Sequence, residues 1–235
     1  MPTDIRSSSQ NQSATGTAVS VSAPTGTVPG DVVVISVHCN GQTTIVDNNG
    51  STSFTEKIND YKPNVSDGHT ASIFERKIIA GDPSTYNFTI GSSGRWSIVA
   101  VTIKDVHPDA LYDVAPSTAN AAGFYDGGVP SYGTTAAAPS ITTTHDKSID
   151  FIFGYADDGG GGAMTAPGGY TVRGNPTNEP QVVATAVKSP AGATGTRTLT
   201  ATSGAAMIAL SFAVRVYSKP IIKQISQAVN RASTY

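Results

Sequence analysis

The sequence of 235 residues has a formal net charge of −2, and charged residues make up only 14% of it. The chain therefore lacks the basic field that attracts nucleic acid, and low charge with many apolar runs is not the composition of a disordered protein. The single cysteine, Cys39, excludes an internal disulfide. The length fits one large all-β domain or two small ones.

Residues 1–14 are polar and without period, which predicts an N-terminal arm that is ordered only when something binds it. The start of the chain has no charged-then-apolar layout, so we do not expect a signal peptide. The longest apolar stretch, residues 205–214, is too short to span a bilayer. We therefore expect a chain made in the cytoplasm, without membrane contact.

Short β-branched runs that alternate in period two, bounded by Gly, Pro, Asn, Asp and Ser, predict strands. In the first half of the chain they lie at residues 15–22, 31–39, 43–46, 52–58, 69–79, 86–90 and 95–104. Asp47 to Gly50 is typical of a tight turn, so we expect the runs at 43–46 and 52–58 to pair. Cys39 shares a strand face with Val33, Ile35 and Val37, which predicts a buried, inert thiol.

Residues 106–139 lack period and are long for a loop inside a compact domain. This segment is either a crossover between two sheets or a surface for a partner, with a short strand at 111–114. A hairpin of residues 140–144 and 147–156 follows, and the remaining strands are predicted at 169–173, 181–188, 196–202 and 205–217. No internal repeat of fixed period is present.

A short C-terminal helix is predicted in residues 218–235, because Pro220 suits a first helical turn and four aliphatic side chains share one face. These side chains are Ile221, Ile222, Ile225 and Val229. About three turns of helix are not stable alone, so the stripe packs either on its own sandwich or on another subunit. The second alternative makes the four residues a partner-docking face.

Residues with catalytic or metal-binding chemistry are sparse. The histidines, His38, His69, His107 and His145, are scattered without ligand spacing, and we expect them at the surface or in turns. Asp47, Asp157 and Asp158 are candidate carboxylates for glycan hydrolysis or calcium, but turn formation explains most of them without catalysis. We therefore predict no catalytic residue, no metal and no cofactor.

Aromatic residues in the predicted loops suggest a surface for contact. Phe124, Tyr125 and Tyr132 lie in the long aperiodic segment, where they either stack on sugars or cap the edges of the sandwich. We mark these three residues as a candidate contact loop.

Several segments, taken in order, resemble a family of β-sandwich virion proteins of tailed bacteriophages. The matching residues are Pro29-Gly30-Asp31 before an apolar strand, 45–50 leading to Phe54, 79–88, Lys104-Asp105-Val106, 139–146, and a last strand that ends at Ala213-Val214-Arg215. Many members carry a Pro-x-Gly-Trp turn after the second strand, which this chain replaces with Asp47 to Gly50. The resemblance covers residues 15–216 and implies a structural protein of the capsid or tail without a catalytic motif.

Together these observations predict an all-β protein, a jelly-roll-like antiparallel β-sandwich over residues 15–217, with the arm at 1–14 and the helix at 218–235. The resemblance implies a non-enzymatic virion protein that decorates or cements the capsid. Its partners are then the major capsid protein or tail proteins and further copies of itself, with no nucleic acid. A tail, baseplate or fibre component, or a carbohydrate-binding host-adhesion module with a glycan as partner, are the alternatives.

Overall fold

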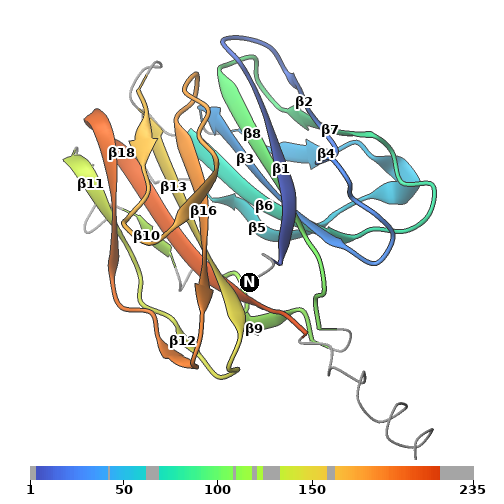
Figure 1. Ribbon diagram of the computed structural model, residues 1–235. Helices are drawn as coiled ribbons and strands as arrows, with labels where there is room; N and C mark the ends of the chain where they lie inside the picture. The colour runs from blue at the N-terminus through green and yellow to red at the C-terminus, as the bar shows by residue number, and fades with distance from the viewer. Residues whose placement is uncertain are drawn as a thin grey trace, which may run out of the picture.

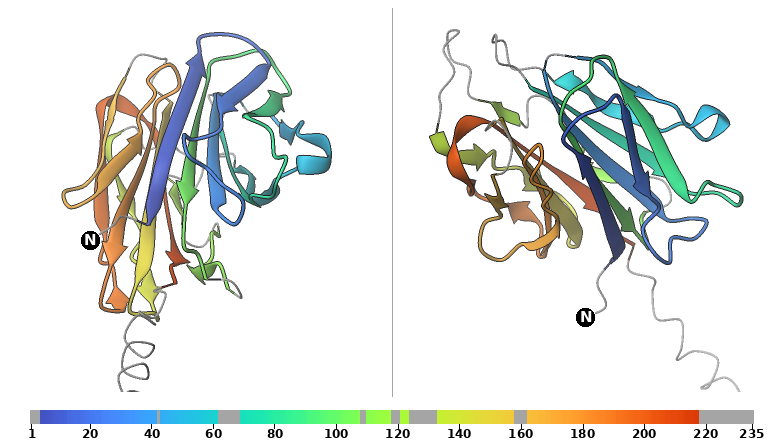
Figure 2. Two further views of the ribbon diagram at one scale, coloured as in Figure 1. Left: turned by 45° about the vertical axis from the view of Figure 1, so that its right-hand side comes forward. Right: turned by 90° about the horizontal axis from the view of Figure 1, so that it is seen from above.

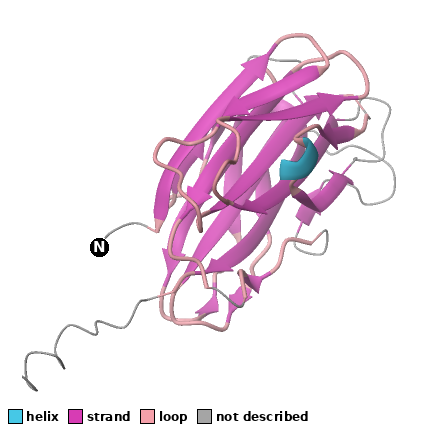
Figure 3. Cartoon of the chain, turned by 90° about the vertical axis from the view of Figure 1, so that its right-hand side faces the viewer, coloured by secondary structure: helices cyan, strands magenta, loops and turns pink. Residues whose placement is uncertain are grey.

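A computed structural model describes residues 4–41, 43–61, 69–107, 110–117, 121–123, 133–157 and 162–217. This part of the chain is almost entirely β, and its named strand pairs are antiparallel (Figure 1). Within these ranges the structure has one short 3-10 helix, η1 (Gly50–Thr52) (Figure 3). The predicted all-β fold class is therefore confirmed.

The first half of the chain forms two sheets. The larger has the strand order β1-β8-β3-β6-β5, and the smaller has the order β2-β7-β4. The strands are β1 (Ile5–Ser13), β2 (Ala18–Ser22), β3 (Val32–Asn40), β4 (Ile45–Asp47), β5 (Thr55–Tyr61), β6 (His69–Lys77), β7 (Thr85–Ile90) and β8 (Trp96–Ile103).

The second half is built around one long strand, β18 (Arg197–Arg215). Its C-terminal part pairs with β13, and the sheet has the order β10-β18-β13-β16-β15. Its N-terminal part pairs with β11 and β14, while β9 joins its outer edge and β12 pairs with β17. The strands are β9 (Tyr112–Val114), β10 (Ala121–Gly123), β11 (Gly133–Ala138), β12 (Thr142–Thr143), β13 (Ser148–Asp157), β14 (Met164–Thr165), β15 (Thr171–Gly174), β16 (Gln181–Lys188) and β17 (Gly192–Ala193).

The two halves repeat the same strand order. In the first, β8 lies between β1 and β3, β3 pairs with β6, and β6 pairs with β5; in the second, β18 lies between β10 and β13, β13 pairs with β16, and β16 pairs with β15. The smaller sheets correspond too, because β7 lies between β2 and β4 as the first part of β18 lies between β11 and β14. A sequence without a fixed period thus folds into a repeat of topology.

The large sheets of the two halves pack face to face, so that the sheets form successive layers (Figures 1 and 2). The core between them includes Val34 and Val101 from the first half, and Phe151, Phe153 and Phe212 from the second. A further core fills each half between its large sheet and the smaller strands. Because both faces of each large sheet are covered, β3, β8 and β13 are buried almost throughout.

Aromatic stacking reinforces the central core. The Phe151 ring lies 5.0 Å from the Phe212 ring and 5.9 Å from the Phe153 ring, at interplanar angles of 13°. Burial of each phenyl ring stabilises the fold by about 1.5–3 kcal/mol relative to exposure, an upper value because unfolded chains already bury some surface. The predicted buried Cys39 is also confirmed, and it packs in the core of the first half.

The expectation that residues 1–14 form an arm outside the sandwich, ordered only when something binds it, is wrong for the residues that the structure describes. Residues 5–13 form β1, which pairs along its length with β8. On one face, the side chains of Ser7, Ser9 and Asn11 donate hydrogen bonds to backbone carbonyls of residues 20–25. Both faces of β1 make polar contacts, so its residues show no alternation of apolar and polar side chains from which a strand could be predicted.

Both predicted hairpins are wrong in their pairing. β4 pairs with β7 and β5 with β6, because Asp47 accepts hydrogen bonds from the backbone N–H groups of Asn49 and Phe54 and turns the chain from one sheet to the other. Likewise β12 pairs with β17, and β13 pairs with β16 and β18. The short strand expected at 111–114 is confirmed as β9, and the predicted helix at 218–235 lies outside the described residues.

Candidate functional site

A cluster of buried polar side chains interrupts the apolar core between the two halves. Its members have exposed fractions of 0–1% and are Ser36, His38, His69, Ser97, Tyr155, Glu179 and Gln181. Four of them belong to the large sheet of the first half, on β3, β6 and β8. The other three come from β13, from β16 and from the turn before β16. The cluster is therefore shared between the halves.

Strand alternation explains which β3 side chains enter the cluster. Val33, Ile35 and Val37 face the core of the first half, so Ser36 and His38 point the opposite way, toward the second half. Cys39, the next residue, packs on the other face, in the core of the first half.

A chain of hydrogen bonds runs across the junction. Ser36 Oγ lies 2.8 Å from Tyr155 Oη and donates to Gln181 Oε1 at 2.8 Å. Gln181 Nε2 donates to Ser97 Oγ at 2.8 Å, and Ser97 Oγ donates to the backbone carbonyl of Glu179 at 2.6 Å. Each serine hydroxyl thus has a carbonyl-type acceptor, so neither donates its proton to a histidine as a nucleophilic serine would.

His38 and His69 form a buried pair. His38 Nε2 lies 2.6 Å from His69 Nδ1, and the ring planes are nearly perpendicular, at 71°. Burial lowers the pKa of His69 to about 3. Burial and the neighbouring His69 hold the pKa of His38 well below its usual value, although nearby backbone carbonyls of Glu179 and Pro180 oppose this. Both imidazoles are therefore neutral at pH 7, and one donates an N–H to the other.

Two ring nitrogens of this pair are left over. His38 Nδ1 and His69 Nε2 are buried and have no hydrogen-bond partner among the residues that the structure describes. A buried polar atom without a partner costs free energy, about 1–3 kcal/mol, so each calls for a physical explanation.

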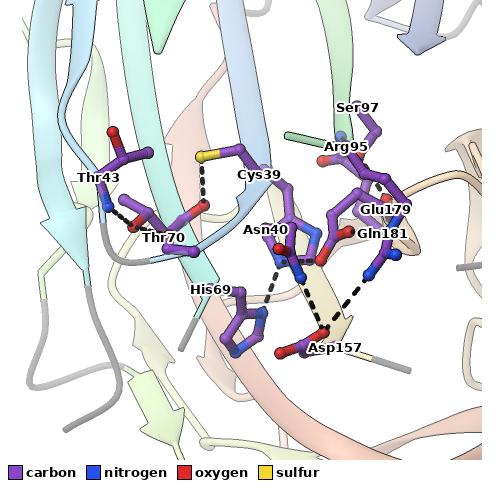
Figure 4. A network of polar contacts seen from close by, with 12 residues as sticks. Cys39, Asn40, Thr43, His69, Thr70, Arg95, Ser97, Asp157, Glu179 and Gln181 are labelled. Atoms are coloured by element: carbon purple, nitrogen blue, oxygen red, sulfur yellow. Dashed lines mark hydrogen bonds and ion pairs between the residues drawn. The ribbon is translucent and has the colours of Figure 1, made fainter. Parts of the chain in front are cut away.

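Glu179 brings a carboxylate to the histidine pair. Its Oε1 lies 3.9 Å from His38 Nε2, and its Oε2 accepts a hydrogen bond from Arg95 Nε at 3.2 Å. Arg95 also reaches Asp157 Oδ1, at 4.0 Å, and this oxygen accepts a hydrogen bond from Asn40 Nδ2 (Figure 4). With two carboxylates, one guanidinium and two neutral imidazoles, the group carries a net charge of about −1 at neutral pH.

The donor atoms of this group match those that bind transition metals. Within the described residues, His38, His69 and Glu179 are the set of three such side chains whose ligand atoms lie within 4.8 Å of one another. Imidazole nitrogens and carboxylate oxygens are common ligands of Zn²⁺. Geometrically, the three side chains are able to surround one small cation.

The expectation that all four histidines lie at the surface or in turns is wrong for His38 and His69, which are fully buried. His145 does lie at a bend, with 41% of its side chain exposed. The three clustered residues come from distant parts of the sequence, and the only available signal was the position of His38 opposite Cys39. No sequence pattern marks His69 or Glu179.

The other predicted site residues lie outside the described part of the chain. These are the docking residues Ile221, Ile222, Ile225 and Val229, the contact-loop residues Phe124, Tyr125 and Tyr132, and Asp158. Asp157 is described, and it contacts Asn40 and Arg95 at the rim of the cluster.

Comparisons with protein-family models, with curated proteins and with solved structures find no match to this chain. A search of the described residues for a helix long and apolar enough to cross a membrane also finds none.

Proposed function

We propose that this chain is a non-enzymatic structural protein of a tailed-bacteriophage virion that decorates or cements the capsid. The observation that carries the proposal is the strand order of the first half, β1-β8-β3-β6-β5 in the large sheet and β2-β7-β4 in the small one, which the second half repeats with β18 in place of both β7 and β8. A jelly roll of eight strands joins its first, eighth, third and sixth strands in one sheet, and this fold recurs in viral capsid proteins. We therefore propose two jelly-roll-like units, with the fifth strand moved to the edge of the large sheet.

The layered packing suits a subunit that must withstand mechanical force in a particle. Three cores follow one another across the molecule, and hydrogen bonds such as Ser36 to Gln181 connect the halves. A stack of this kind resists relative movement of its halves, as a subunit that bridges its neighbours requires. Many copies in a symmetric particle then add up individually modest interfaces.

We propose that residues 218–235 form the docking helix, with Ile221, Ile222, Ile225 and Val229 against a neighbouring virion protein. The described chain ends at Tyr217, whose N–H donates to the backbone carbonyl of Asp105. Val106 and Val216 form a β-bridge beside this bond, so the last described residues before the proposed segment are held against the chain that follows β8.

Deletion of residues 219–235 tests this proposal. The truncated chain should remain folded, with unchanged thermal unfolding, but should fail to enter particles in cells infected with a phage that lacks the full-length gene. Electron microscopy of particles with the full chain should show its density on the capsid. Density at the tail would favour the tail or baseplate alternative, and complete absence from particles, with the folded full chain present in the lysate, would contradict a virion role.

A host-adhesion module is the alternative on the same fold, because jelly rolls also occur in lectins. The triple substitution of Phe124, Tyr125 and Tyr132 by Ala separates the two roles. For a cement protein, it should reduce the resistance of particles to heat and leave adsorption to the host unchanged. Loss of adsorption by particles of normal heat stability would support the adhesion role instead.

A further inference from the structure

We propose that His38, His69 and Glu179 bind one divalent transition-metal ion of the zinc class at the junction of the two halves. The ligand atoms are His38 Nε2, His69 Nδ1 and Glu179 Oε1. This site goes beyond the proposed virion role and does not depend on it, and it replaces the expectation from sequence that the chain binds no metal.

The distances in the cluster require only small movements to accommodate an ion. Two nitrogens bound to one tetrahedral Zn²⁺ at about 2.0–2.1 Å lie about 3.3 Å from each other. His38 Nε2 and His69 Nδ1 are 2.6 Å apart, and Glu179 Oε1 is 3.9 Å from His38 Nε2. The imidazole nitrogens must therefore separate by roughly 0.7 Å, and Glu179 Oε1 must approach His38 Nε2 by about half an ångström. The ligand atoms of the three side chains all lie within 4.8 Å of one another.

Charge also favours a cation at this place. The carboxylates of Asp157 and Glu179 outnumber the guanidinium of Arg95. Arg95 Nε donates to Glu179 Oε2 at 3.2 Å, and Glu179 Oε1 lies 3.9 Å from His38 Nε2. A divalent ion would change the net charge of the group from about −1 to about +1. The proton between the two imidazoles would move to the far nitrogen of the ring that carries it, so both rings stay neutral and both facing nitrogens can bind the ion. Because the ion neutralises buried negative charge, its own desolvation is partly offset.

The ligand set selects the class of ion. Two imidazoles and one carboxylate suit Zn²⁺ and its neighbours Co²⁺ and Ni²⁺, whereas Ca²⁺ and Mg²⁺ prefer six or more oxygen ligands. Three protein ligands leave a fourth position of a tetrahedral ion for water.

The site would act as a clamp between the two sandwiches. His38 lies on β3 and His69 begins β6, both in the first half, while Glu179 precedes β16 in the second half. One ion would therefore crosslink strands that the chain connects only through the long segment after β8. Metal bound only to the folded chain raises the free energy of unfolding in proportion to the logarithm of its concentration.

The first experiment is calorimetric titration of Zn²⁺ into the full chain, purified without a histidine tag and freed of metal by a chelator. We expect one ion per chain. Glu179→Gln keeps the size and the Arg95 contact of the side chain but removes the charged ligand. We expect its affinity for Zn²⁺ to be at least about 100-fold lower than that of wild type. His69→Gln should have the same effect, and His145→Gln, at an exposed histidine outside the cluster, should bind like wild type.

Binding by Glu179→Gln and His69→Gln with wild-type affinity, or no binding by the folded wild-type chain at micromolar Zn²⁺, would overturn the proposal. A second measurement needs no variant, so it holds even if a substitution prevents folding. Zn²⁺ and Co²⁺ should raise the unfolding temperature of the wild-type chain, while equal concentrations of Ca²⁺ and Mg²⁺ should not. An equal rise with all four ions would count against a histidine site.

Discussion

The side-chain oxygen Oε1 of Gln12, on the first strand, accepts hydrogen bonds from the backbone N–H groups of Thr177 and Asn178, at 2.5 and 3.0 Å. Gln10 does the same for the N–H of Asn175, at 2.8 Å. The two faces of β1 thus contact different halves of the molecule. Ser7, Ser9 and Asn11 bind the first half, and the two glutamines bind the second. β1 is a polar connector between the sandwiches.

We expect Gln12→Ala to lower the free energy of unfolding by about 1 kcal/mol, because a partly exposed hydrogen bond contributes 0.5–1.5 kcal/mol and water replaces some of the loss. Urea unfolding should show a lower midpoint with an unchanged slope. Asn11→Ala is the matched control, since it removes a contact within the first half only. If Gln10→Ala and Gln12→Ala together cost nothing, β1 does not connect the halves in this way.

The buried hydrogen-bond chain predicts an order of effects. Gln181→Leu removes two hydrogen bonds at once, the one from Ser36 and the one to Ser97, and we expect a loss of about 2 kcal/mol, since Ser36 keeps Tyr155 and Ser97 keeps the carbonyl of Glu179. Tyr155→Phe removes one contact and leaves Ser36 bound to Gln181, so it should cost only about 1 kcal/mol. Chemical unfolding of both variants checks the order, and the reverse order would contradict this account of the network.

Gly174 ends β15 where the second half approaches β8 of the first. A Cβ atom at this position would lie 2.5 and 2.6 Å from the two Cγ atoms of Val99, which is buried in the central core. We expect Gly174→Ala to destabilise the fold by about 1–3 kcal/mol, because a close-packed core accommodates an extra methyl group only by strain.

Two further variants sharpen this test. Gly168→Ala is the control, since its Cβ would meet nothing within 4 Å. Val99→Ala combined with Gly174→Ala should recover part of the stability that the second substitution loses alone, because the truncated side chain makes room for the new methyl group. Additive losses in the double variant would show that the two positions are not in contact.

The sequence predicts the strands that have one regular apolar pattern. It does not predict strands whose existence or length depends on the segments with which they pair. β3, β7 and β16 follow from alternating or continuous apolar residues, and their expected ranges agree closely with the structure. β1 escapes prediction because both of its faces bind polar groups. The pattern predicts two strands where the structure has the single strand β18. The corresponding strands of the first half, β7 and β8, are separate, but in the second half the chain continues without a break from one sheet to the other.

Pairing and the buried cluster depend on contacts between distant residues, which local patterns do not encode. The Asp47 turn has the composition of a hairpin turn, but its carboxylate binds the N–H of Phe54 and directs the chain to the other sheet. His38, His69 and Glu179 meet only because β3 pairs with β6 and the second half packs on both. The repeat of strand order is likewise visible only in the pairing.

The ion pair of Arg76 and Asp82 predicts a loss of stability in acid. Arg76 donates two hydrogen bonds to the carboxylate, at 2.7 and 3.0 Å, and these contacts hold the pKa of Asp82 below its usual value of 3.8. A carboxyl group whose pKa is lower in the folded state stabilises the fold at pH values above its unfolded pKa. That contribution disappears as the pH falls below 3.8 and through the folded pKa. In Asp82→Asn, the free energy of unfolding should be lower at pH 7 and should fall less steeply between about pH 5 and pH 2 than in wild type. Urea unfolding at a series of pH values measures both profiles, and parallel profiles would show that Asp82 does not contribute to the acid sensitivity of the fold.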